Sequence, residues 1–449
     1  MLTKTASVLD ALNQKIKDHT ATVGVVGLGY VGLPFAVEKA KVGFPVIGIE
    51  LSEERAAQVN RAENYIADVD DAELKAIVES GRLKAVVGFD CVSEVDVMVI
   101  CVPTPLTKNL TPNLSYVESV TRSLAEHLKP GQLISLESTT YPGTTDEVVR
   151  PILENVSGLV QGRDFFLAHS PERVDPGNQR YTTKNTNKVV GASDPDSLAI
   201  ATLFYQQTID HVVPVTSAKA AELVKVFENT FRAVNIALVN ELAMLCDRMD
   251  LDVWEVLDAA NTKPFGIMPF YPGPGVGGHC IPIDPHYLEW KAKELNFNTH
   301  FIALAGEINR KMPLFVLDKV RRVLNKAGIA PARSKVLVMG AAYKKDLSDW
   351  RESPAIEIIR LLLKDGVEVA YHDRHVPNIQ VDDYQLSSMA LSASAVASAN
   401  LVIIATDHTG VDYTQLIAQS QHVLDTRGIT RHLIEQVGAE NFAQKVTLL

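Results

Sequence analysis

The sequence predicts an α/β protein in which two doubly wound parallel sheets are joined by a domain built on a long helix. Three observations lead to this prediction. Short buried-strand patterns alternate with helical stretches near both ends of the chain. Between them, residues 217–249 keep apolar side chains at helical spacing without a glycine or proline. A glycine fingerprint, Gly27-x-Gly29-x-x-Gly32, follows the first strand pattern.

Each half of the chain supplies its own set of strands and helices, so we expect two Rossmann-like domains. The N-terminal strands are expected over 22–27, 45–50, 95–102, 133–136 and 165–168, with helices over 1–20, 33–42 and 116–128. The C-terminal strands are expected over 335–340, 367–371, 401–405 and 422–425, with a helix over 354–365. The predicted domains are 1–205 (dinucleotide binding), 206–312 (central and helical) and 313–449 (the second Rossmann-like domain).

Composition excludes several classes of protein. The chain has 449 residues and a formal net charge of -11, which argues against a nucleic-acid partner. No apolar run approaches the roughly 18 residues of a membrane span, so we expect no membrane partner. The four cysteines are scattered without a CxxC pair, as is typical of reduced thiols in a cytoplasmic protein.

The glycine fingerprint indicates NAD because of its context. It follows a strand, opens a helix and is followed by Glu50 at the end of the next strand. A carboxylate there accepts hydrogen bonds from ribose hydroxyls and repels the 2′-phosphate of NADP. The residues expected to bind NAD are Gly27, Gly29, Tyr30, Val31, Gly32, Glu50, Arg55, Thr104 and Thr139. The alternative is a glycine turn that binds no dinucleotide.

Polar side chains follow three further strands of the first sheet. Residues 102–105 and 138–143 carry hydroxyls where carboxyl strand ends line a cofactor crevice, although turn and cap roles would also explain them. Glu172 follows another strand and is a candidate base or water-orienting acid, with a surface carboxylate as the alternative. These side chains suit contacts to ribose, nicotinamide or water.

Lys225 and Asn229 are four residues apart on the long helix and therefore share one face. Leu223 and Phe227 are close in sequence, so we expect that face to be otherwise apolar. An ammonium beside a reacting carbon–oxygen bond stabilises an alkoxide, whereas the alternative is a lysine that extends its charge to solvent. So long a helix is also a common dimer interface.

Cys280 is the most informative residue for chemistry. It ends a glycine-rich stretch, 273–279, and Asp284 follows four residues later. A nucleophilic thiol beside a nicotinamide can trap an aldehyde, so that a second hydride leaves and an acid forms. The alternatives are an inert buried cysteine and a metal ligand. The spacing of His279, Cys280, Asp284 and His286 fits no zinc pattern, so no metal is expected.

Taken together, these motifs resemble the nucleotide-sugar 6-dehydrogenase family, which includes the UDP-glucose and GDP-mannose enzymes. The resemblance extends over about 22–428 and includes, in order, the NAD fingerprint, Ser138-Thr139 before Pro142-Gly143, the Lys-x-x-x-Asn helix and the cysteine loop. It continues with Tyr343-Lys344-Lys345-Asp346 and with Arg351-Glu352-Ser353. It implies a four-electron oxidation of a sugar C6 hydroxyl to a carboxylate, with two NAD reduced, in polysaccharide biosynthesis such as that of an O-antigen.

The resemblance also implies residue roles. Cys280 is the expected nucleophile, Lys225 and Asn229 steady the oxygen, and Asp284 acts with water as the base. Glu172 and Thr139 position that water. The substrate-binding residues implied are Glu172, Arg173, Lys225, Asn229, Tyr271, Gly277, Lys344 and Arg427. The C-terminal domain is expected to hold UDP, and the long helix to build a homodimer or higher homo-oligomer.

Departures from the UDP-glucose branch favour a UDP-N-acetylhexosamine. Ile283 stands where that branch has a lysine, and 262–266 lacks its arginine, for which Lys263 is a candidate substitute. The segment 172–177 lacks that branch's second glutamate. Overall resemblance favours UDP-N-acetylglucosamine over the mannosamine epimer, with UDP-glucose as a further alternative.

Two other functions fit parts of the sequence. A two-electron β-hydroxyacid dehydrogenase shares the Rossmann domain and the Lys-x-x-x-Asn pair but needs no thiol and no third domain. A non-enzymatic sensor of nucleotide sugars binds both ligands without reducing NAD. The number of NADH formed per substrate distinguishes these readings.

Overall fold

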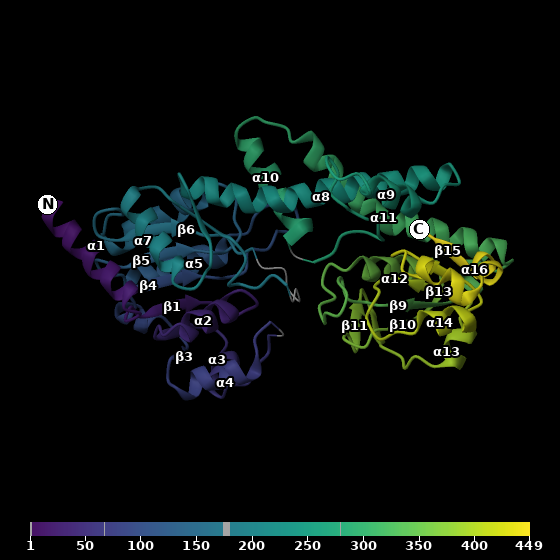
Figure 1. Ribbon diagram of the computed structural model, residues 1–449, viewed down its shortest axis with the longest axis horizontal. Coiled ribbons are helices and arrows are strands. Elements are labelled where there is room, and N and C mark those ends of the chain that lie inside the picture. Colours follow the sequence, from purple (N-terminus) through teal and green to yellow (C-terminus); the bar gives the residue numbers. More distant parts are fainter. Residues whose placement is uncertain (1, 67, 174–179, 279) are drawn as a thin grey trace. The chain divides into compact units, whose positions relative to one another are not determined.

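The computed structural model describes residues 2–66, 68–173, 180–278 and 280–449 (Figure 1). His279 and the expected departure within 174–177 lie outside the described residues. The chain divides into two compact units, Met1–Glu228 with His286–Phe297, and Asn229–Pro285 with Asn298–Leu449. Two helices, α8 (Ala218–Arg248) and α10 (Cys280–Glu294), contribute residues to both units.

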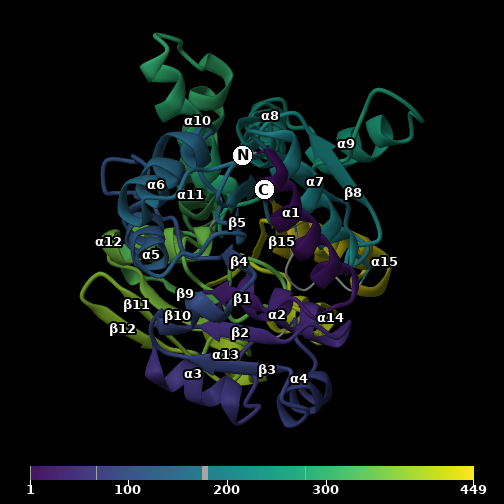
Figure 2. The ribbon, with the colours of Figure 1, turned by 90° about the vertical axis from the view of Figure 1, so that its left-hand side faces the viewer.

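The first unit contains an eight-stranded sheet of order β3-β2-β1-β4-β5-β6-β7-β8. Its strands are β1 (Val23–Val26), β2 (Val46–Ile49), β3 (Leu83–Val86), β4 (Val97–Ile100), β5 (Leu133–Leu136), β6 (Phe166–His169), β7 (Lys188–Ala192) and β8 (Val212–Val215). All neighbours are parallel except β6 and β7, which run antiparallel. Figure 2 shows β3, β2, β1, β4 and β5 stacked in this order. The first six strands have the Rossmann order.

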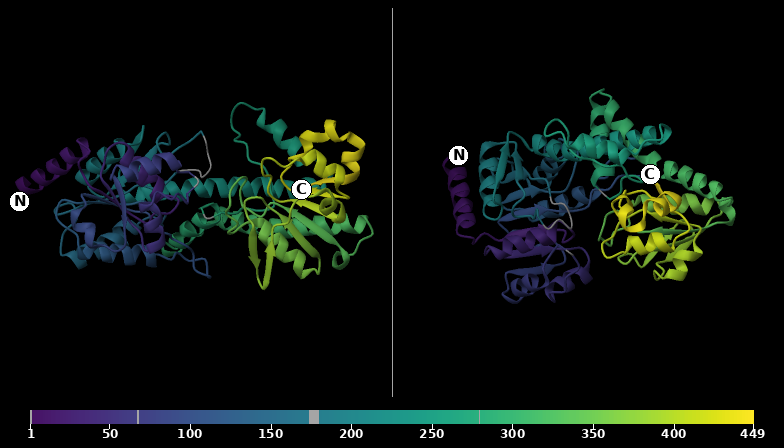
Figure 3. Two further views of the ribbon diagram at one scale, coloured as in Figure 1. Left: turned by 90° about the horizontal axis from the view of Figure 1, so that it is seen from below. Right: turned by 45° about the vertical axis from the view of Figure 1, so that its right-hand side comes forward.

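Helices cover both faces of this sheet, because its short strands are buried on each side. One core joins alternate strand residues to α1 (Leu2–Lys17), α2 (Gly32–Lys41), α4 (Asp71–Glu79) and α7 (Pro195–Gln206). The other core joins the opposite strand residues to α5 (Ser115–Glu126) and α6 (Arg150–Ser157). The short α3 spans Glu53–Asn60. In Figure 3, α1 is the purple helix at the N terminus.

The second unit contains a parallel five-stranded sheet of order β10-β9-β13-β14-β15 and a hairpin, β11–β12. The strands are β9 (Lys335–Met339), β10 (Glu368–His372), β11 (Asn378–Val381), β12 (Tyr384–Ser387), β13 (Leu401–Ile404), β14 (Val423–Asp425) and β15 (Val446–Leu448). Its helices are α9 (Val253–Asn261), α11 (His300–Lys326), α12 (Pro354–Lys364), α13 (Ala393–Ser398), α14 (Tyr413–Gln419), α15 (Ile434–Val437) and α16 (Ala439–Lys445). Helices α11 and α12 pack on one face, and α13 and α14 on the other.

The predicted fold class is confirmed: two doubly wound α/β sheets accompany a long helix, α8, which is 31 residues long. One local expectation differs. Cys280 is the first residue of α10 rather than part of a loop, and Pro285 lies inside that helix. Proline is tolerated in the first turn of a helix, where its missing N–H has no partner to lose. Pro285 lies beyond that turn, and it therefore hid the helical pattern in the sequence.

Among the helices of the described residues, none combines the length and the apolar character that a membrane span requires.

Asp373 organises the carboxyl edge of the second sheet. Its carboxylate accepts the N–H groups of Ala341 (2.7 Å) and Ala342 (3.0 Å), which follow β9, and that of His375 (2.7 Å). His408, which follows β13, donates Nε2–H at 2.9 Å. Burial alone would raise the pKa of Asp373, but these hydrogen bonds outweigh it and hold the pKa well below its ordinary value.

We therefore expect Asp373→Asn to lower the free energy of unfolding at pH 7 by about 3 kcal/mol, because the remaining donors lose an ionised acceptor. The wild-type advantage is complete above the ordinary carboxyl pKa of about 4 and is lost as pH falls toward the folded-state pKa. Urea unfolding at pH 7 and pH 3 measures both effects. The exposed Asp383→Asn is the control and should change stability by less than about 0.5 kcal/mol. An equal loss at both pH values would contradict the role of the charge.

Candidate active site

The glycine turn after β1 has the shape of a pyrophosphate cradle. Gly27 has a φ of +87°, and a Cβ there would lie 2.5 Å from the Cys101 carbonyl oxygen. A Cβ on Gly32 would lie 1.8 Å from the Gly27 oxygen, whereas one on Gly29 would meet nothing within 4 Å. The outer glycines therefore permit close packing, and the middle one leaves open space. Val31, the N-cap of α2, makes no side-chain cap bond, which leaves the Gly32 N–H at the start of the helix available to an anion.

Glu50 lies at the end of β2 and is 8% exposed. Its oxygens accept the N–H groups of Leu28 (3.0 Å) and Ser52 (3.2 Å), so the carboxylate fixes the glycine turn, and its contact with a ribose stays a prediction. Tyr65 donates its hydroxyl to the Leu28 oxygen at 2.7 Å. Arg55 is exposed, with its guanidinium carbon 6.0 Å from the centre of the Tyr65 ring. These residues fit the adenosine half of NAD.

Thr139 and Glu172 follow neighbouring strands at the same edge of the first sheet. Leu136, the last residue of β5, pairs with His169, the last residue of β6, so each polar residue comes three positions after its strand. Thr104 follows β4 at this edge, and its carbonyl oxygen accepts the Tyr287 hydroxyl at 2.7 Å. The fold therefore places the residues that carry the predicted hydroxyl and carboxylate groups along the carboxyl edge of the sheet, on strands beside the one that ends in the glycine turn.

Lys225 and Asn229 lie one turn apart on α8 and are buried, at 9% and 5% exposure. The expectation that Lys225 lies on an apolar face with Leu223 and Phe227 is wrong, because these two side chains are 42% and 59% exposed. Residues two positions from Lys225 are rotated about 200° around a helix, so they lie on the opposite side. The face of Lys225 is therefore mixed, and carries the apolar Ala221 as well as the polar Asn229.

Glu222, on the buried face of α8, was not found from the sequence. Its carboxylate accepts the N–H of Gly143 (2.5 Å), the N–H of Thr145 (2.8 Å) and the Thr145 hydroxyl (2.7 Å). Burial raises the pKa of Glu222 to about 7 against these hydrogen bonds. This carboxylate ties the helix that carries Lys225 to the loop that carries Thr139.

In the second unit, Cys280 is exposed at the N-terminus of α10. Partial positive charge at a helix N-terminus favours an anion, here the thiolate. Asp284 lies one turn later and is 3% exposed, and its Oδ2 accepts Asn229 Nδ2–H at 2.5 Å. Two of the predicted catalytic side chains, Asn229 and Asp284, are thus hydrogen-bonded to each other.

The glycine stretch before Cys280 packs tightly on the segment that contains Lys344. A Cβ on Gly277 would lie 2.7 Å from Tyr343 Cβ, and one on Gly278, whose φ is +82°, would lie 2.8 Å from the Tyr343 ring. Glycine is therefore required at both positions. Asn240 of α8, which the sequence did not reveal, accepts the Gly273 N–H at 3.0 Å and fixes the start of the stretch.

Arg427 reaches the same stretch from the end of β14. A Cβ on Gly273 would lie 3.1 Å from an Arg427 guanidinium nitrogen, and Arg427 Nε–H donates to the Ala405 oxygen at 2.8 Å. Asp425 accepts the Arg427 N–H at 2.8 Å. Burial lowers the pKa of Arg427, but a guanidinium keeps its charge at neutral pH. Gly277, Lys344 and Arg427 are thus gathered around residues 273–278.

Two further predicted substrate residues already have protein partners. The Arg173 guanidinium donates to Glu228 (2.5 Å) and to the Asn187 oxygen (2.6 Å). Tyr271 donates its hydroxyl to Asp258 at 2.8 Å. Both side chains therefore stabilise loops, and their contact with a substrate stays a prediction.

Comparison with known proteins identifies the family. The NAD binding domain of the UDP-glucose/GDP-mannose dehydrogenase family matches residues 21–209, the central domain 219–311 and the UDP binding domain 337–432. The chain belongs to this family. The resemblance found in the sequence is confirmed, and the chain is an NAD-dependent nucleotide-sugar dehydrogenase.

Relatives match nearly the full length of this dehydrogenase. UDP-N-acetyl-D-mannosamine dehydrogenase of Pyrococcus horikoshii is 35% identical over 415 residues, which are 91% of this chain and 96% of that protein. UDP-N-acetyl-D-glucosamine 6-dehydrogenase of Pseudomonas aeruginosa is 34% identical over 410 residues, 90% and 95% of the two chains. A solved structure of the Pyrococcus horikoshii enzyme has a TM-score of 0.83 and 34% identity, and covers 91% of this chain and 96% of its own.

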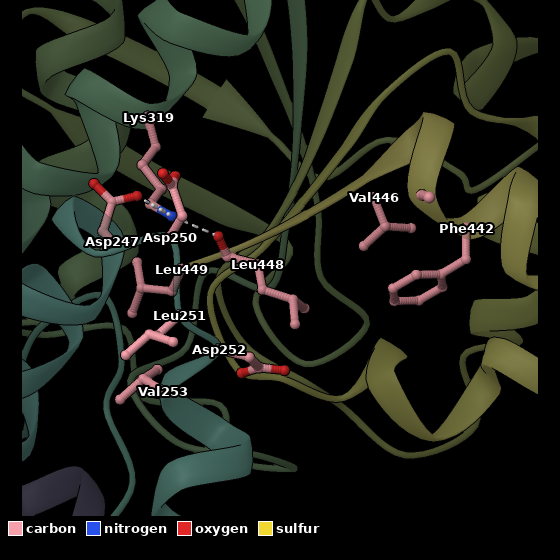
Figure 4. A pocket seen from close by; sticks show the side chains of 11 residues that line it. Asp247, Asp250, Leu251, Asp252, Val253, Lys319, Phe442, Val446, Leu448 and Leu449 are labelled. Atoms are coloured by element: carbon pink, nitrogen blue, oxygen red, sulfur yellow. Dashed lines mark hydrogen bonds and ion pairs between the residues drawn. The ribbon is translucent and has the colours of Figure 1, made fainter.

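A pocket in the second unit of the dehydrogenase lies apart from these residues. It is lined by the turn after α8, Lys319 of α11 and the C-terminal residues from Phe442 to Leu449 (Figure 4). Lys319 Nζ donates to Asp247 at 2.8 Å and to the Leu448 oxygen at 2.7 Å. No predicted site residue lines the pocket, so we assign it no part in the reaction.

Asp346, His375 and His408 of the dehydrogenase bring potential metal-ligand atoms within 4.8 Å of one another. Both ring nitrogens of His408 are already used, since Nδ1 accepts the Asp346 N–H at 2.9 Å and Nε2 donates to Asp373 at 2.9 Å. The cluster is a hydrogen-bond network that stabilises the carboxyl edge of the second sheet.

Glu50→Gln should relax the preference of the dehydrogenase for NAD over NADP. The amide keeps an acceptor for the backbone N–H groups but removes the charge that strengthens hydrogen bonds from the ribose hydroxyls, so NAD binding should weaken by roughly tenfold or more. NADP binding should weaken less, because the repulsion of its 2′-phosphate is also removed. Fluorescence titration with NADH and NADPH measures the ratio of dissociation constants. Glu53→Gln, on the exposed first turn of α3, is the control and should leave the ratio unchanged. An unaltered ratio in Glu50→Gln would show that the ribose contact is misplaced.

Proposed function

We propose that this dehydrogenase oxidises the C6 hydroxyl of UDP-N-acetylglucosamine to a carboxylate through a thiohemiacetal and a thioester on Cys280. The observation that carries the proposal is the exposed Cys280 thiol at the N-terminus of α10. Asp284 lies one turn later on the same helix and is hydrogen-bonded to Asn229. A two-electron alcohol dehydrogenase has no use for this arrangement, whereas acid formation needs a nucleophile that retains the aldehyde.

The bonds and electrons balance in this sequence of steps. NAD supplies the hydride acceptor for both oxidations. The Cys280 thiolate forms a bond to the aldehyde carbon. The aldehyde oxygen takes up a proton and becomes the thiohemiacetal hydroxyl. Loss of that proton and of hydride from the same carbon gives the thioester. Water then adds, the carbon–sulfur bond breaks, and the thiolate is regenerated. One alcohol and one water thus yield one carboxylate, two NADH and three protons.

The remaining side chains have roles that follow from their chemistry. Lys225 and Asn229 are proposed to donate to the developing alkoxide and then to the thiohemiacetal oxygen. Asp284, oriented by the amide of Asn229, is the proposed base, acting with water. Thr139 and Glu172 are proposed to position the hydrolytic water.

The UDP group is proposed to bind in the C-terminal domain, near Gly277, Lys344 and Arg427. The family's name for residues 337–432, a UDP binding domain, supports this placement. Two cationic side chains near one tightly packed glycine stretch suit a diphosphate and the sugar attached to it.

The choice of sugar is supported by the names of the relatives and by one position in the sequence. Relatives named for N-acetylmannosamine and N-acetylglucosamine are 35% and 34% identical, so identity does not separate the epimers. Both names support an N-acetylhexosamine, as does Ile283 in place of the lysine of the glucose branch. Overall resemblance favours the glucosamine epimer, with the mannosamine epimer as the alternative.

A panel of UDP-sugars with NADH counted per sugar consumed tests this proposal. UDP-N-acetylglucosamine should give the highest kcat/KM and two NADH per sugar. A higher kcat/KM with UDP-N-acetylmannosamine would reverse the choice of epimer. One NADH per sugar would instead favour the two-electron β-hydroxyacid dehydrogenase.

Cys280→Ser should abolish formation of the acid, because a serine hydroxyl is not ionised at neutral pH and is a far weaker nucleophile than a thiolate. NAD binding should stay intact, because residue 280 lies outside the glycine turn. Product analysis by mass spectrometry and NADH titration measure the two effects. Cys91→Ser, at a half-buried thiol in the first unit, is the control and should retain activity. If Cys280→Ser makes the acid at the wild-type rate, the thioester pathway is wrong.

We also propose that α8 forms a dimer interface with a second copy of this chain. Large apolar side chains recur along one exposed stripe of the helix at spacings of four and seven residues. The exposed members are Leu223, Phe227, Phe231, Leu238 and Leu245. Such a stripe on a helix about 45 Å long is self-complementary across a twofold axis.

Leu238→Glu should convert the dimer to a monomer, because a charge at the centre of the stripe would be buried without a partner. Sedimentation velocity measures the change. Leu110→Glu, at an exposed apolar residue of a loop in the first unit, is the control and should remain dimeric. A Leu238→Glu variant that sediments as the wild type would rule out this interface.

A further inference from the structure

Lys188 reaches the carboxyl edge of the first sheet because its strand runs backwards. β7 is antiparallel to β6, with His169 opposite Gly191, so the first residue of β7 lies beyond the last residue of β6. The Ser170 hydroxyl donates to the Val189 oxygen at 2.8 Å, which fixes this alignment. A lysine at the start of β7 is thus placed beside the residues that follow β6.

The ammonium of Lys188 contacts two carboxylates. Nζ donates to Glu137 Oε2 at 2.9 Å and to Glu172 Oε2 at 3.4 Å. The other oxygen of Glu137 accepts the Tyr205 hydroxyl at 2.7 Å, and that hydroxyl lies 2.7 Å from Ser135 Oγ. The side chains of Lys188 and Glu137 are 6% and 0% exposed, whereas that of Glu172 is 14% exposed. Glu137 is therefore the anchor, and Glu172 is the partner that faces outward.

Lys188 keeps its charge in this setting. Burial alone would lower the pKa of Lys188, but Glu137 and Glu172 outweigh burial and raise it. Two other basic groups near Lys188 are held toward their neutral forms. Burial and Lys188 lower the pKa of His169 to about 3, and burial lowers the pKa of Lys39 well below its ordinary value.

Two further acidic groups that interact with this pair of carboxylates stay uncharged. Burial raises the pKa of the Cys101 thiol and of the Tyr205 phenol, so both stay protonated. The backbone N–H of Arg173 donates to Glu172 at 2.6 Å, and the Arg173 guanidinium is paired with Glu228. The charge on Lys188 is thus shared between two carboxylates that would otherwise repel each other.

We propose that Lys188 is a positioning residue for thioester hydrolysis: anchored on Glu137, its ammonium holds the carboxylate of Glu172 in the place where that carboxylate orients water. This inference rests on the proposed function, which assigns Glu172 to the hydrolytic water. Glu137 directly precedes Ser138 and Thr139, so the same ion pair fixes the loop of the second water-positioning residue.

If Lys188 acts in hydrolysis and not only in folding, two variants should shift the acid limb of the kcat profile in opposite directions. Lys188→Met removes a positive charge beside Glu172, so protonation of Glu172 becomes easier and the acid limb of the kcat profile should move up by about one pH unit. Glu137→Gln removes a negative charge and keeps the bond to Tyr205, so the acid limb should move down. Lys188→Arg restores the charge and should return the limb toward the wild-type position.

The test is kcat for acid formation between pH 5 and pH 9 with UDP-N-acetylglucosamine and NAD, together with the fraction of Cys280 carrying a sugar adduct by intact mass. Adduct should accumulate at low pH in Lys188→Met, because hydrolysis becomes the slow step. Lys184→Met, at an exposed lysine before β7, is the control and should retain the wild-type profile.

Each outcome separates this inference from the proposed function. If the kcat–pH profile of Lys188→Met, scaled to the same maximum, superimposes on that of the wild type, the lysine has a purely structural role, and the inference is overturned. If Lys188→Met does not fold, an unshifted limb in Glu137→Gln overturns it equally. If Glu172→Gln keeps the wild-type kcat and accumulates no adduct, the assignment of Glu172 itself fails, and with it this inference.

Discussion

The parallel alignment of the strands is the constraint on which the rest of this structure depends. It delivers the loops after β1, β2, β4, β5 and β6 to one edge of the first sheet, and with them the glycine turn, Glu50, Thr139 and Glu172. The single reversal, at β7, brings Lys188 to the same edge from the opposite direction. Residues distant in sequence thus become neighbours at one edge, where each lies within a few positions of a strand that backbone hydrogen bonds hold in place.

The second unit uses the same constraint with different chemistry. Asp373, Thr406 and Arg427 follow β10, β13 and β14 at one edge, and the glycine stretch before Cys280 packs on Tyr343, which follows β9. Glycine there is a steric requirement, since any Cβ would enter the tyrosine ring. Cys280, the proposed nucleophile, therefore follows a stretch that packs on the domain that the family associates with UDP, while Asn229 of α8 fixes Asp284 one turn after Cys280.

Local patterns in the sequence predicted most of the fold and the residues with distinctive chemistry. Strand and helix positions followed from apolar periodicity, and Cys280 followed from its glycine setting. The sequence could not reveal Glu222, Asn240 or the pair Glu137 and Lys188, because their partners are 33 to 79 residues away and ordinary polar residues carry no local signal. The buried face of α8 was misjudged for a related reason: neighbours in sequence were taken as neighbours on the helix, although two positions correspond to about 200° of rotation.

The central claim is that the sugar is bound covalently to Cys280 between its two oxidations. Rapid quenching of a single turnover in acid, followed by peptide mapping by mass spectrometry, measures this directly. The account predicts a transient mass increase of one UDP-sugar acyl group on the peptide that contains Cys280, which rises with the second NADH and falls as the acid appears. Release of two NADH and the acid with no adduct on that peptide, or with the adduct on another cysteine, would contradict it.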